Sequence, residues 1–450
     1  MRIVYLWDAD YPWDVRTEKV CAALTDAGHD VVIAARNRGW RARTERLAEG
    51  TVRRMRPWRW MGRRLDGLLS FPAFFSPRWT GLLADAVRES DAELVIVRDL
   101  PLCPAAIRVA RRSGIPVILD MAENYPAMLR QTWDAGRRRP WDLLVRNPAL
   151  AAAVERWCLP RVDRVVVVVA ESAKRLVGLG VPAGRIDVVS NTPPGTRALA
   201  ITRETRIGAP LSLVYVGLME VPRGIRELLD AVAGLRREGA DVRLRLIGGG
   251  RDLSLFRAHA AALGLDDDAV EFTGHVPHAQ AMRAVAQADV GVVPHHADEA
   301  WNTTIPNKLF DYMAAGLPVV SSDAAPAARI VTETGAGVVF RSGDADSLAK
   351  AVRRMANPAA RLRMGRAGRD AVRARYNWEA DSAALLHAVE AAVGTSRVVP
   401  RIRTSTRPPE PAPGRARALH GLHRGVGETD FSRQLRPHVL PVDRLFDDDE

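Results

Sequence analysis

The residues best suited to chemistry lie around the stretch PNKLFDYMAAGLPVV, which covers positions 306–320. Its first proline suits the first turn of a helix, and its glycine and second proline end that helix before a strand. The amides of Thr303, Thr304 and Ile305 would then lie at a helix amino terminus, whose partial positive charge and free N–H donors suit a phosphate. Lys308, one of only four lysines in the chain, adds a full positive charge.

Asp311 lies one turn beyond the lysine and carries a carboxylate that can accept two hydrogen bonds from a vicinal diol such as a ribose. With Asn307 and Lys308, it predicts a site that holds a nucleotide diphosphate at one end and its sugar at the other. A capped helix with an exposed lysine would explain the same residues. The inference therefore depends on the rest of the chain.

Three other strand ends carry glycines. Arg223 and Gly224 come directly before an expected helix, after a strand that ends at Gly217, and this arrangement also suits a phosphate. Gly249 is the middle residue of a triple glycine at a second strand end. His275 follows a third strand, where a flat base could stack on its ring. A tight turn and a surface histidine explain the last two features equally well.

The elements around these residues alternate between strands and helices. Apolar runs such as RIVYLW (2–7) and VDRVVVVVA (162–170) are separated by segments of helical periodicity, and a second series begins at LSLVYVG (211–217). Runs that are buried on both faces are typical of parallel sheets covered by helices. We therefore predict two doubly wound α/β halves, with ligands bound in the cleft between them at the carboxyl ends of the strands.

The chain has 450 residues, which is more than one hydrophobic core usually serves. We predict an amino-terminal domain over residues 1–195, a linker rich in Pro, Thr and Gly over 196–210, and a carboxyl-terminal domain over 211–377. Helical periodicity resumes over 378–394, where we expect a helix that packs back on the amino-terminal domain. Residues 395–450 have too little apolar content to offset the entropy of ordering, so we expect a disordered tail.

Positive charge is concentrated in one segment. The formal net charge is +12, and residues 36–79 hold twelve arginines against three acids, so this segment supplies +9. Large aromatic residues are interleaved with these arginines, as on a surface that meets lipid headgroups. The alternative is an arginine-rich solvated face whose aromatics lie in the core. We expect contact with an anionic membrane surface and none with nucleic acid, because no recognised nucleic-acid-binding motif accompanies the charge.

The compartment is inferred from cysteines and hydropathy. Cys21, Cys103 and Cys158 are widely spaced and show no metal-type spacing. Charge appears too early for a signal peptide, and no stretch reaches the roughly 20 apolar residues that a spanning helix needs. We expect a cytoplasmic protein with reduced cysteines, located peripherally on the inner face of the cell membrane.

Several ordered blocks between Leu211 and Trp378 resemble the donor-binding half of the family 4 glycosyltransferases, of the group 1 type. They are YVG (215–217), VPRGIRELLDAV (221–232), LRLIGGG (244–250), VEFTGHVP (270–277), ADVGVVP (288–294) and PNKLFDYMAAGLPVVSSD (306–323). The amino-terminal half resembles the family more loosely, through blocks such as ILDMAENYPAML (118–129).

The resemblance implies the GT-B fold, in which two Rossmann-like domains face a central cleft. It also implies a nucleotide-sugar-dependent enzyme of the hexosyltransferase type that transfers sugar with retention of anomeric configuration, with no cofactor and no bound metal. We expect a glycan or lipid-linked acceptor, in cell-surface polysaccharide or glycolipid biosynthesis.

The resemblance implies roles for single donor-side residues. Arg223 stands where the family has a lysine, whereas Leu218 replaces the family's arginine, so we expect Lys308 to supply the missing cation. Both cations would be catalytic because they stabilise the charge that builds on the leaving diphosphate. Asp311 corresponds to the second of two paired acids and is expected to hold the ribose. Thr304 stands where the first acid would be, so Thr304 and its neighbouring amides are expected to face the phosphates or the donor sugar.

The acceptor side matches the family less closely. The family's Asp-x-His-Glu block reads DMAE here, so that Ala122 stands where the histidine would be. Glu123 and Asn124 are the nearest polar candidates, with Glu123 as a third catalytic candidate, and burial or strand capping explains them equally well. Asp14 and Arg16, just past the first strand, are also expected to meet the acceptor.

Two other functions fit the same sequence. A non-catalytic protein that binds a sugar nucleotide or a glycan would explain the three missing family residues. A hydrolysing nucleotide-sugar epimerase shares the expected architecture, but the PNKLFDYMAAGLP block fits a transferase better.

Overall fold

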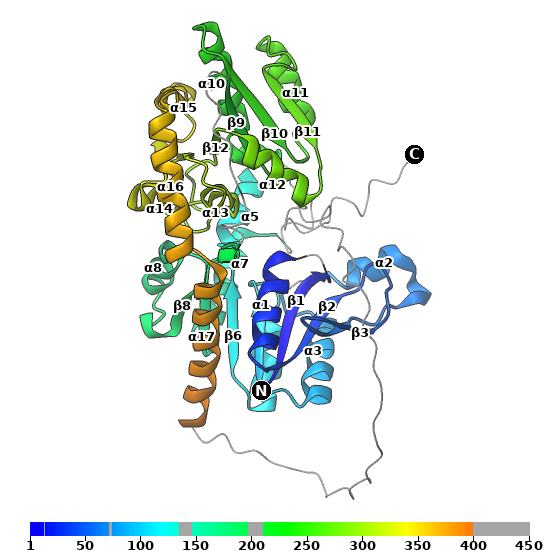
Figure 1. Ribbon diagram of the computed structural model, residues 1–450. Helices are drawn as coiled ribbons and strands as arrows, with labels where there is room; N and C mark the ends of the chain where they lie inside the picture. Colours follow the sequence, from blue (N-terminus) through cyan, green and yellow to red (C-terminus); the bar gives the residue numbers. More distant parts are fainter. Residues whose placement is uncertain (13, 72–73, 135–145, 197–209, 399–450) are drawn as a thin grey trace, which may run out of the picture.

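The computed structural model describes residues 1–12, 14–71, 74–134, 146–196 and 210–398. Two halves are stacked end to end, and each is built around one sheet with helices packed against it (Figure 1). The predicted fold class, two doubly wound α/β domains, is confirmed.

The amino-terminal half contains an eight-stranded sheet in the order β3-β4-β2-β1-β5-β6-β7-β8, in which every neighbouring pair is parallel except β3 and β4. The strands are β1 (Arg2–Asp10), β2 (Asp30–Arg36), β3 (Thr44–Leu47), β4 (Gly50–Arg54), β5 (Leu94–Arg98), β6 (Val117–Met121), β7 (Arg164–Val167) and β8 (Ile186–Val188). The helices are α1 (Val15–Asp26), α2 (Gly62–Leu69), α3 (Pro77–Ser90), α4 (Cys103–Ser113), α5 (Tyr125–Asp134), α7 (Pro148–Cys158) and α8 (Ala170–Gly178), with short 3-10 turns η1 (Arg59–Met61), η2 (Leu159–Arg161) and η3 (Ala183–Arg185).

The carboxyl-terminal half contains a six-stranded parallel sheet in the order β11-β10-β9-β12-β13-β14. Its strands are β9 (Leu211–Val216), β10 (Val242–Ile247), β11 (Val270–Gly274), β12 (Val290–Val293), β13 (Val319–Ser322) and β14 (Gly337–Phe340). The helical elements are η4 (Val221–Arg223), α10 (Ile225–Arg237), α11 (Leu253–Ala262), α12 (His278–Gln287), α13 (Lys308–Ala314), α14 (Ala325–Thr334), α15 (Ala345–Arg354), α16 (Pro358–Ala374) and α17 (Trp378–Val398).

Strand β1 illustrates why its apolar run is continuous. Val4 and Leu6 point into a core cluster shared with α3 and α4, whereas Ile3 and Tyr5 point into a second cluster on the other face, shared with α1 and α17. All four side chains are fully buried. Both faces of the strand are thus covered, as a doubly wound sheet requires.

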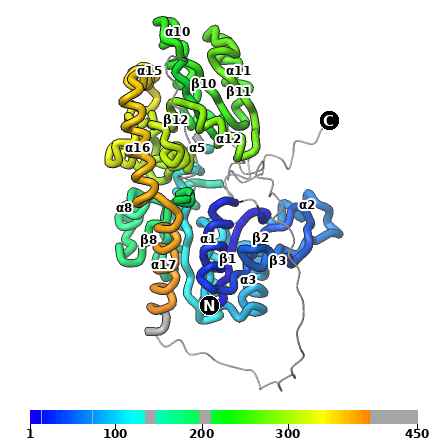
Figure 2. The backbone as a smooth tube through the Cα atoms, in the orientation of Figure 1, coloured from blue at the N-terminus to red at the C-terminus, as the bar shows by residue number. Residues whose placement is uncertain are grey.

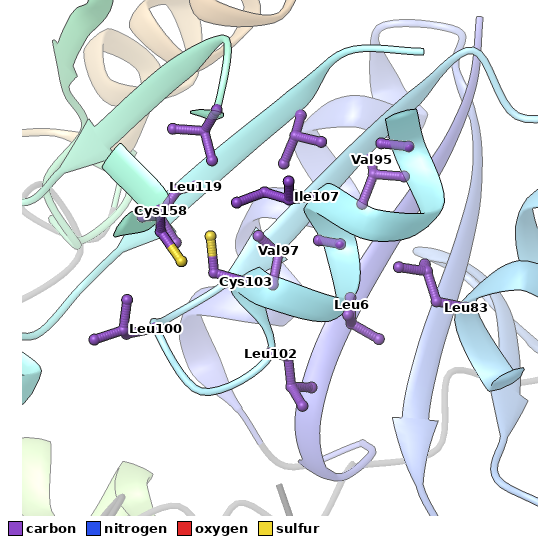
Figure 3. Close-up of a cluster of buried hydrophobic side chains, with 14 of the residues drawn as sticks. Leu6, Leu83, Val95, Val97, Leu100, Leu102, Cys103, Ile107, Leu119 and Cys158 are labelled. Atoms are coloured by element: carbon purple, nitrogen blue, oxygen red, sulfur yellow. The ribbon is translucent and has the colours of Figure 1, made fainter. Parts of the chain in front are cut away.

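Figure 3 shows part of the first cluster, in which Leu6 of β1 lies near Leu83 of α3 and Ile107 of α4. The sulfur atoms of Cys103 and Cys158 lie close together in the same cluster, and both thiols are free and buried. Burial raises the pKa of the Cys103 thiol well above its usual value. These two cysteines therefore act as small apolar core residues.

Helix α17 connects the two halves. It follows α16 of the carboxyl-terminal half and packs on the amino-terminal sheet, where Leu385 and Val389 share a core cluster with Ile3 (Figure 2). The predicted end of this helix at residue 394 is wrong, because α17 continues to Val398. A single glycine costs a helix only about 1 kcal/mol, which is too little to end it.

The predicted linker (196–210) and the predicted tail lie mostly outside the described residues. None of the helices in the part of the chain that the structure describes is both long and apolar enough to cross a membrane.

Candidate active site

A cavity of about 800 Å³ lies between the two halves. The amino-terminal half contributes the last residue of β5 and residues that follow β1 and β6, and the carboxyl-terminal half contributes residues that follow β9, β10 and β12. The cavity therefore lies at the carboxyl ends of strands from both sheets, where ligands of doubly wound sheets bind.

Ten of the predicted site residues line this cavity, namely Asp14, Arg16, Glu123, Gly217, Arg223, Thr304, Ile305, Asn307, Lys308 and Asp311. The other five, Asn124, Gly224, Gly249, His275 and Thr303, are not among the lining residues. The structure thus brings the donor-side cations together but changes the roles of several neighbours.

Lys308 reaches the end of the first strand of the carboxyl-terminal half. Its Nζ lies 3.6 Å from the ring centroid of Tyr215 and has no hydrogen-bond partner among the described residues. At Gly217, whose φ is +147°, a Cβ atom would come within 2.7 Å of that nitrogen, so glycine leaves the room that the lysine occupies. Burial, together with the charge of Arg223, lowers the pKa of the Lys308 ammonium well below its usual value.

Arg223 ends the 3-10 turn η4 and is held from two sides. Its Cζ lies 5.1 Å from the ring centroid of Trp301, and its Nε lies 3.6 Å from Oε2 of Glu220. Glu220 is buried, and its other oxygen lies 3.6 Å from Nε of Arg251. Glu220 and Trp301 were not among the predicted site residues, although the position of Glu220 three residues before Arg223 indicates an ion pair.

Buried polar atoms without partners gather beside these cations. Among the described residues, no hydrogen-bond partner exists for either ring nitrogen of His295, for Nε1 of Trp301 or for Nε of Arg223. The His295 and Trp301 ring centroids are 4.2 Å apart. Burial and the charges of Lys308 and Arg223 lower the pKa of His295 well below its usual value and so favour the neutral imidazole. Buried unsatisfied groups are rare, so their concentration here is typical of a site whose partners come from a ligand or solvent.

The helix after the cavity loop begins later than predicted. Helix α13 starts at Lys308 with Asn307 at its cap, so the amides of residues 303–305 do not lie at its terminus. The Thr303 amide is already used, because it donates to the Ala300 carbonyl at 3.1 Å. A turn covers residues 298–303, and residues 304–306 lie in no helix or turn. The amides of Asn307 and Lys308 lie at the terminus instead.

Asn124 and Thr303 connect the two halves rather than facing a ligand. The Asn124 side-chain amide donates to the Thr303 hydroxyl at 3.1 Å, and its oxygen accepts from the Ala127 amide at 3.3 Å. The Thr304 hydroxyl donates across the same boundary to the Ala122 carbonyl at 3.2 Å. The predictions of an acceptor contact for Asn124 and a donor contact for Thr303 therefore do not match their observed contacts.

Asp14 and Arg16 line the cavity, but both charges are paired within the amino-terminal half. The Asp14 carboxylate caps α1 by accepting from the Thr17 amide at 2.7 Å, and it forms an ion pair with Arg98. The Arg16 Nε donates to Asp120 at 3.0 Å, and all four charged side chains are buried. These pairs give Asp14 and Arg16 a structural role that the sequence prediction did not include.

Three further predictions concern the glycines and His275. A Cβ atom at Gly224 would lie 1.8 Å from the Pro294 carbonyl oxygen, so this glycine allows close packing at the start of α10 instead of facing the cavity. Gly249 lies against His275, which is exposed and outside the lining. His278 lines the cavity where His275 was expected.

Glu123 and Asp311 enter the cavity from opposite halves. Glu123 follows β6 and is half-buried, whereas Asp311 lies in the first turn of α13. No group of three or more His, Cys, Asp or Glu side chains that could hold a metal ion occurs within the described ranges.

Two Rossmann-like domains that face a common cavity define the GT-B fold. Solved structures share the arrangement. Sucrose-phosphate synthase from Thermosynechococcus elongatus has a TM-score of 0.68 at 18% identity and covers 88% of this chain and 100% of its own. Anabaena HepE in complex with UDP has a TM-score of 0.63 at 13% identity, with coverages of 87% and 100%. At such identities the likeness shows the fold.

Family models and relatives identify the family. Residues 14–192 match the glycosyl transferase 4-like domain, and residues 210–357 match glycosyl transferases group 1. The glycogen synthase of Mycobacterium tuberculosis is 27% identical over 327 residues, which is 71% of each chain. The phosphatidyl-myo-inositol mannosyltransferase of Mycobacterium leprae is 27% identical over 289 residues, 63% of this chain and 69% of the relative. The chain belongs to the group 1 glycosyltransferases, and it is a nucleotide-sugar-dependent enzyme, as predicted.

Proposed function

We propose that the chain transfers a sugar from a nucleotide diphosphate donor to a glycan or lipid-linked acceptor, with retention of anomeric configuration, in cell-surface polysaccharide or glycolipid biosynthesis. The observation that supports this most is the approach of the Arg223 and Lys308 cations beside Gly217 in the cavity. Negative charge builds on the diphosphate as it leaves. Two cations in a buried site stabilise that charge more than they would in water.

The position of Lys308 supports its proposed role as a substitute for the family's arginine. Leu218 stands in the arginine's place and is buried. The Lys308 ammonium reaches the adjacent Gly217 from α13, a different element of the same half. A cation is thus delivered to the end of β9 without an arginine at position 218.

Other residues take subsidiary roles in this proposal. Asp311 holds the ribose of the donor, and the amides of Asn307 and Lys308 bind the diphosphate at the start of α13. Glu123 faces the acceptor from the other half. Because the two cations supply the positive charge, the proposed reaction needs no bound metal and no cofactor.

The acceptor class, a glycan or a lipid-linked acceptor, and the cytoplasmic location are also proposals. The named relatives include a glycogen synthase and a phosphatidyl-myo-inositol mannosyltransferase, so both a glycan and a lipid acceptor are represented among them. The three free, buried cysteines suit a reducing cytoplasm.

A donor screen tests the proposal. At equal concentration, a ligand that binds the native state more tightly raises the melting temperature more, so UDP-, GDP-, ADP- and dTDP-sugars are compared by thermal shift. The best donor is then incubated with candidate glycan and lipid-linked acceptors in the presence of EDTA, and the anomeric configuration of the product is read by NMR. Donor binding without release of nucleoside diphosphate would favour a binding protein. Inversion at the anomeric carbon would contradict the retaining mechanism.

A further inference from the structure

Helix α2 (Gly62–Leu69) turns its leucines toward solvent and its carboxylate toward the domain. Leu65, Leu68 and Leu69 are 43%, 51% and 40% exposed, whereas Asp66 on the same helix is buried. A surface helix of a folded protein normally buries its leucines and exposes its carboxylates. The outward face of α2 therefore exposes apolar area that the described residues do not cover.

Polar contacts on its inner side hold α2 in this orientation. The Asp66 carboxylate accepts hydrogen bonds from Nε1 of Trp40 at 3.2 Å and from the Trp58 amide at 2.9 Å. It also pairs with the Arg78 guanidinium at 3.0 Å. Since Asp66 anchors the helix, the exposed leucines are not needed to keep it folded against the domain.

A hollow of about 650 Å³ adjoins the helix, separate from the active-site cavity. It is lined by Trp40, Arg41, Ala42, Arg43, Arg56, Pro57, Trp58, Arg59 and Trp60. Four of these nine described lining residues are arginines, three are tryptophans and none is acidic. The Cζ atoms of Arg59 and Arg63 lie 5.9 Å and 5.1 Å from the Trp40 ring centroid. Such a hollow suits an anionic group next to an apolar one.

The aromatic residues of the basic segment occupy two environments. Trp79 and Phe71 are buried in the amino-terminal half, whereas Trp60 is 82% exposed and Trp58 and Phe75 are also exposed. Six of the fourteen exposed large apolar side chains of the described residues fall between positions 58 and 75. This concentration is the kind of exposed apolar patch that marks an interaction surface.

We propose that α2 and the adjoining hollow form a docking surface for an anionic lipid bilayer. The three leucines and Trp60 enter the boundary between headgroups and acyl chains, and the arginines bind lipid phosphates. The net charge of +9 over residues 36–79 favours a phosphate-rich surface over an uncharged protein face. Figure 1 shows α2 at the edge of the amino-terminal half away from α8 and α17, so a bilayer can approach it there. The inference goes beyond the proposed function, because lipid binding does not require sugar transfer.

Vesicle flotation of the full chain tests the proposal. Vesicles of phosphatidylcholine alone are compared with vesicles of three parts phosphatidylcholine to one part phosphatidylglycerol at low salt. The chain is expected to float with the mixed vesicles and to stay in solution with the neutral ones. No flotation with the mixed vesicles, or equal flotation with both, would overturn the proposal.

Two variants separate the apolar and the charged contributions. L65S/L68S/L69S is expected to bind the mixed vesicles about tenfold more weakly or worse, because the inserted side chains are gone. R56Q/R59Q/R63Q is expected to lose about fivefold in affinity for each arginine removed. The matched controls are L255S/L362S and R243Q/R363Q/R366Q, which change exposed residues of the carboxyl-terminal half and should bind like the parent chain.

Further measurements show whether a loss of lipid binding comes from unfolding or from a general loss of ligand binding. The melting temperature of each variant is compared with that of the parent, since the replaced side chains are exposed and should not affect folding. Thermal shifts by nucleotide sugars should be the same in all variants, so failure of lipid binding and failure of donor binding are distinguishable. The proposal is wrong if L65S/L68S/L69S floats like the parent, or if these changes convert a dimer to a monomer, because a second copy would then cover the face.

Discussion

The Lys308 ammonium lies over the ring of Tyr215, with 3.6 Å between Nζ and the ring centroid. The ring is itself fixed, because its hydroxyl donates to the Leu218 carbonyl at 2.8 Å. The aromatic face thus stabilises a buried cation that has no hydrogen-bond partner among the described residues. A diphosphate that enters the cavity would not have to displace a carboxylate from this lysine, so its charge would be available to the leaving group.

We predict that Lys308→Met lowers turnover by about 10² to 10³-fold, the loss that typically follows removal of one donor to a developing anion. The melting temperature should not fall, because the change removes a buried cation that lacks a hydrogen bond. Lys174→Met, at an exposed position on α8, is the control and should be neutral. Steady-state kinetics with the best donor measures the effect, and near-normal turnover of Lys308→Met would remove this residue from the mechanism.

Arg223→Ala is expected to lower turnover into the same range while the fold is retained. The loss should appear in kcat more than in KM, because the charge on the diphosphate grows in the transition state. Arg226→Ala changes an exposed arginine one turn further along and serves as the control. A rise in KM with unchanged kcat would show that Arg223 only binds the donor.

As pH rises, activity should begin to fall at a lower pH than it would if Lys308 had the usual pKa of a lysine. The pKa of Lys308 is lowered by burial and by Arg223, and the proton must be present for catalysis, so kcat/KM decreases as pH rises through this lowered pKa. Bound diphosphate favours the charged form, so the alkaline limb of kcat should lie at higher pH than that of kcat/KM. In Lys308→Arg the guanidinium stays charged, and the limb should disappear. An unchanged limb in that variant would assign the titration to another group.

Arg16→Met is expected to lower the free energy of unfolding by about 3 to 5 kcal/mol, because it leaves the Asp120 carboxylate buried without its cation. Arg130→Ala removes a partner of Glu299 in an exposed pair and should cost about 0 to 1 kcal/mol. Denaturant unfolding of both variants measures the two losses in the free energy of unfolding. A loss below 1 kcal/mol for Arg16→Met would mean that the Asp120 carboxylate tolerates burial without this partner.

Local patterns in the sequence were sufficient for the architecture. Continuous β-branched runs separated by segments of helical periodicity predicted two sheets covered on both faces, because strand burial and helix amphipathicity are encoded over a few neighbouring residues. The same local features identified Arg223 and Lys308, since Arg223 directly precedes Gly224 and Lys308 comes two positions after Pro306, which indicated the start of a helix. The resemblance to family 4 glycosyltransferases added the class of enzyme.

Contacts between distant residues could be decided only by the tertiary structure. Arg16 pairs with Asp120 from 104 positions away, and Asn124 meets Thr303 from 179 positions away, so neither partner could be read from local spacing. These pairings give Arg16, Asn124 and Thr303 structural contacts in place of the ligand contacts expected for them.

The orientation of α2 was decided in the same way. Its leucines and arginines are evident in the sequence, but which face turns inward depends on Asp66 meeting Trp40, Trp58 and Arg78. Sequence therefore determined which elements form and which residues carry charge. Packing determined which charges are neutralised and which are left for a ligand, because desolvation and pairing depend on neighbours that only the folded chain brings together.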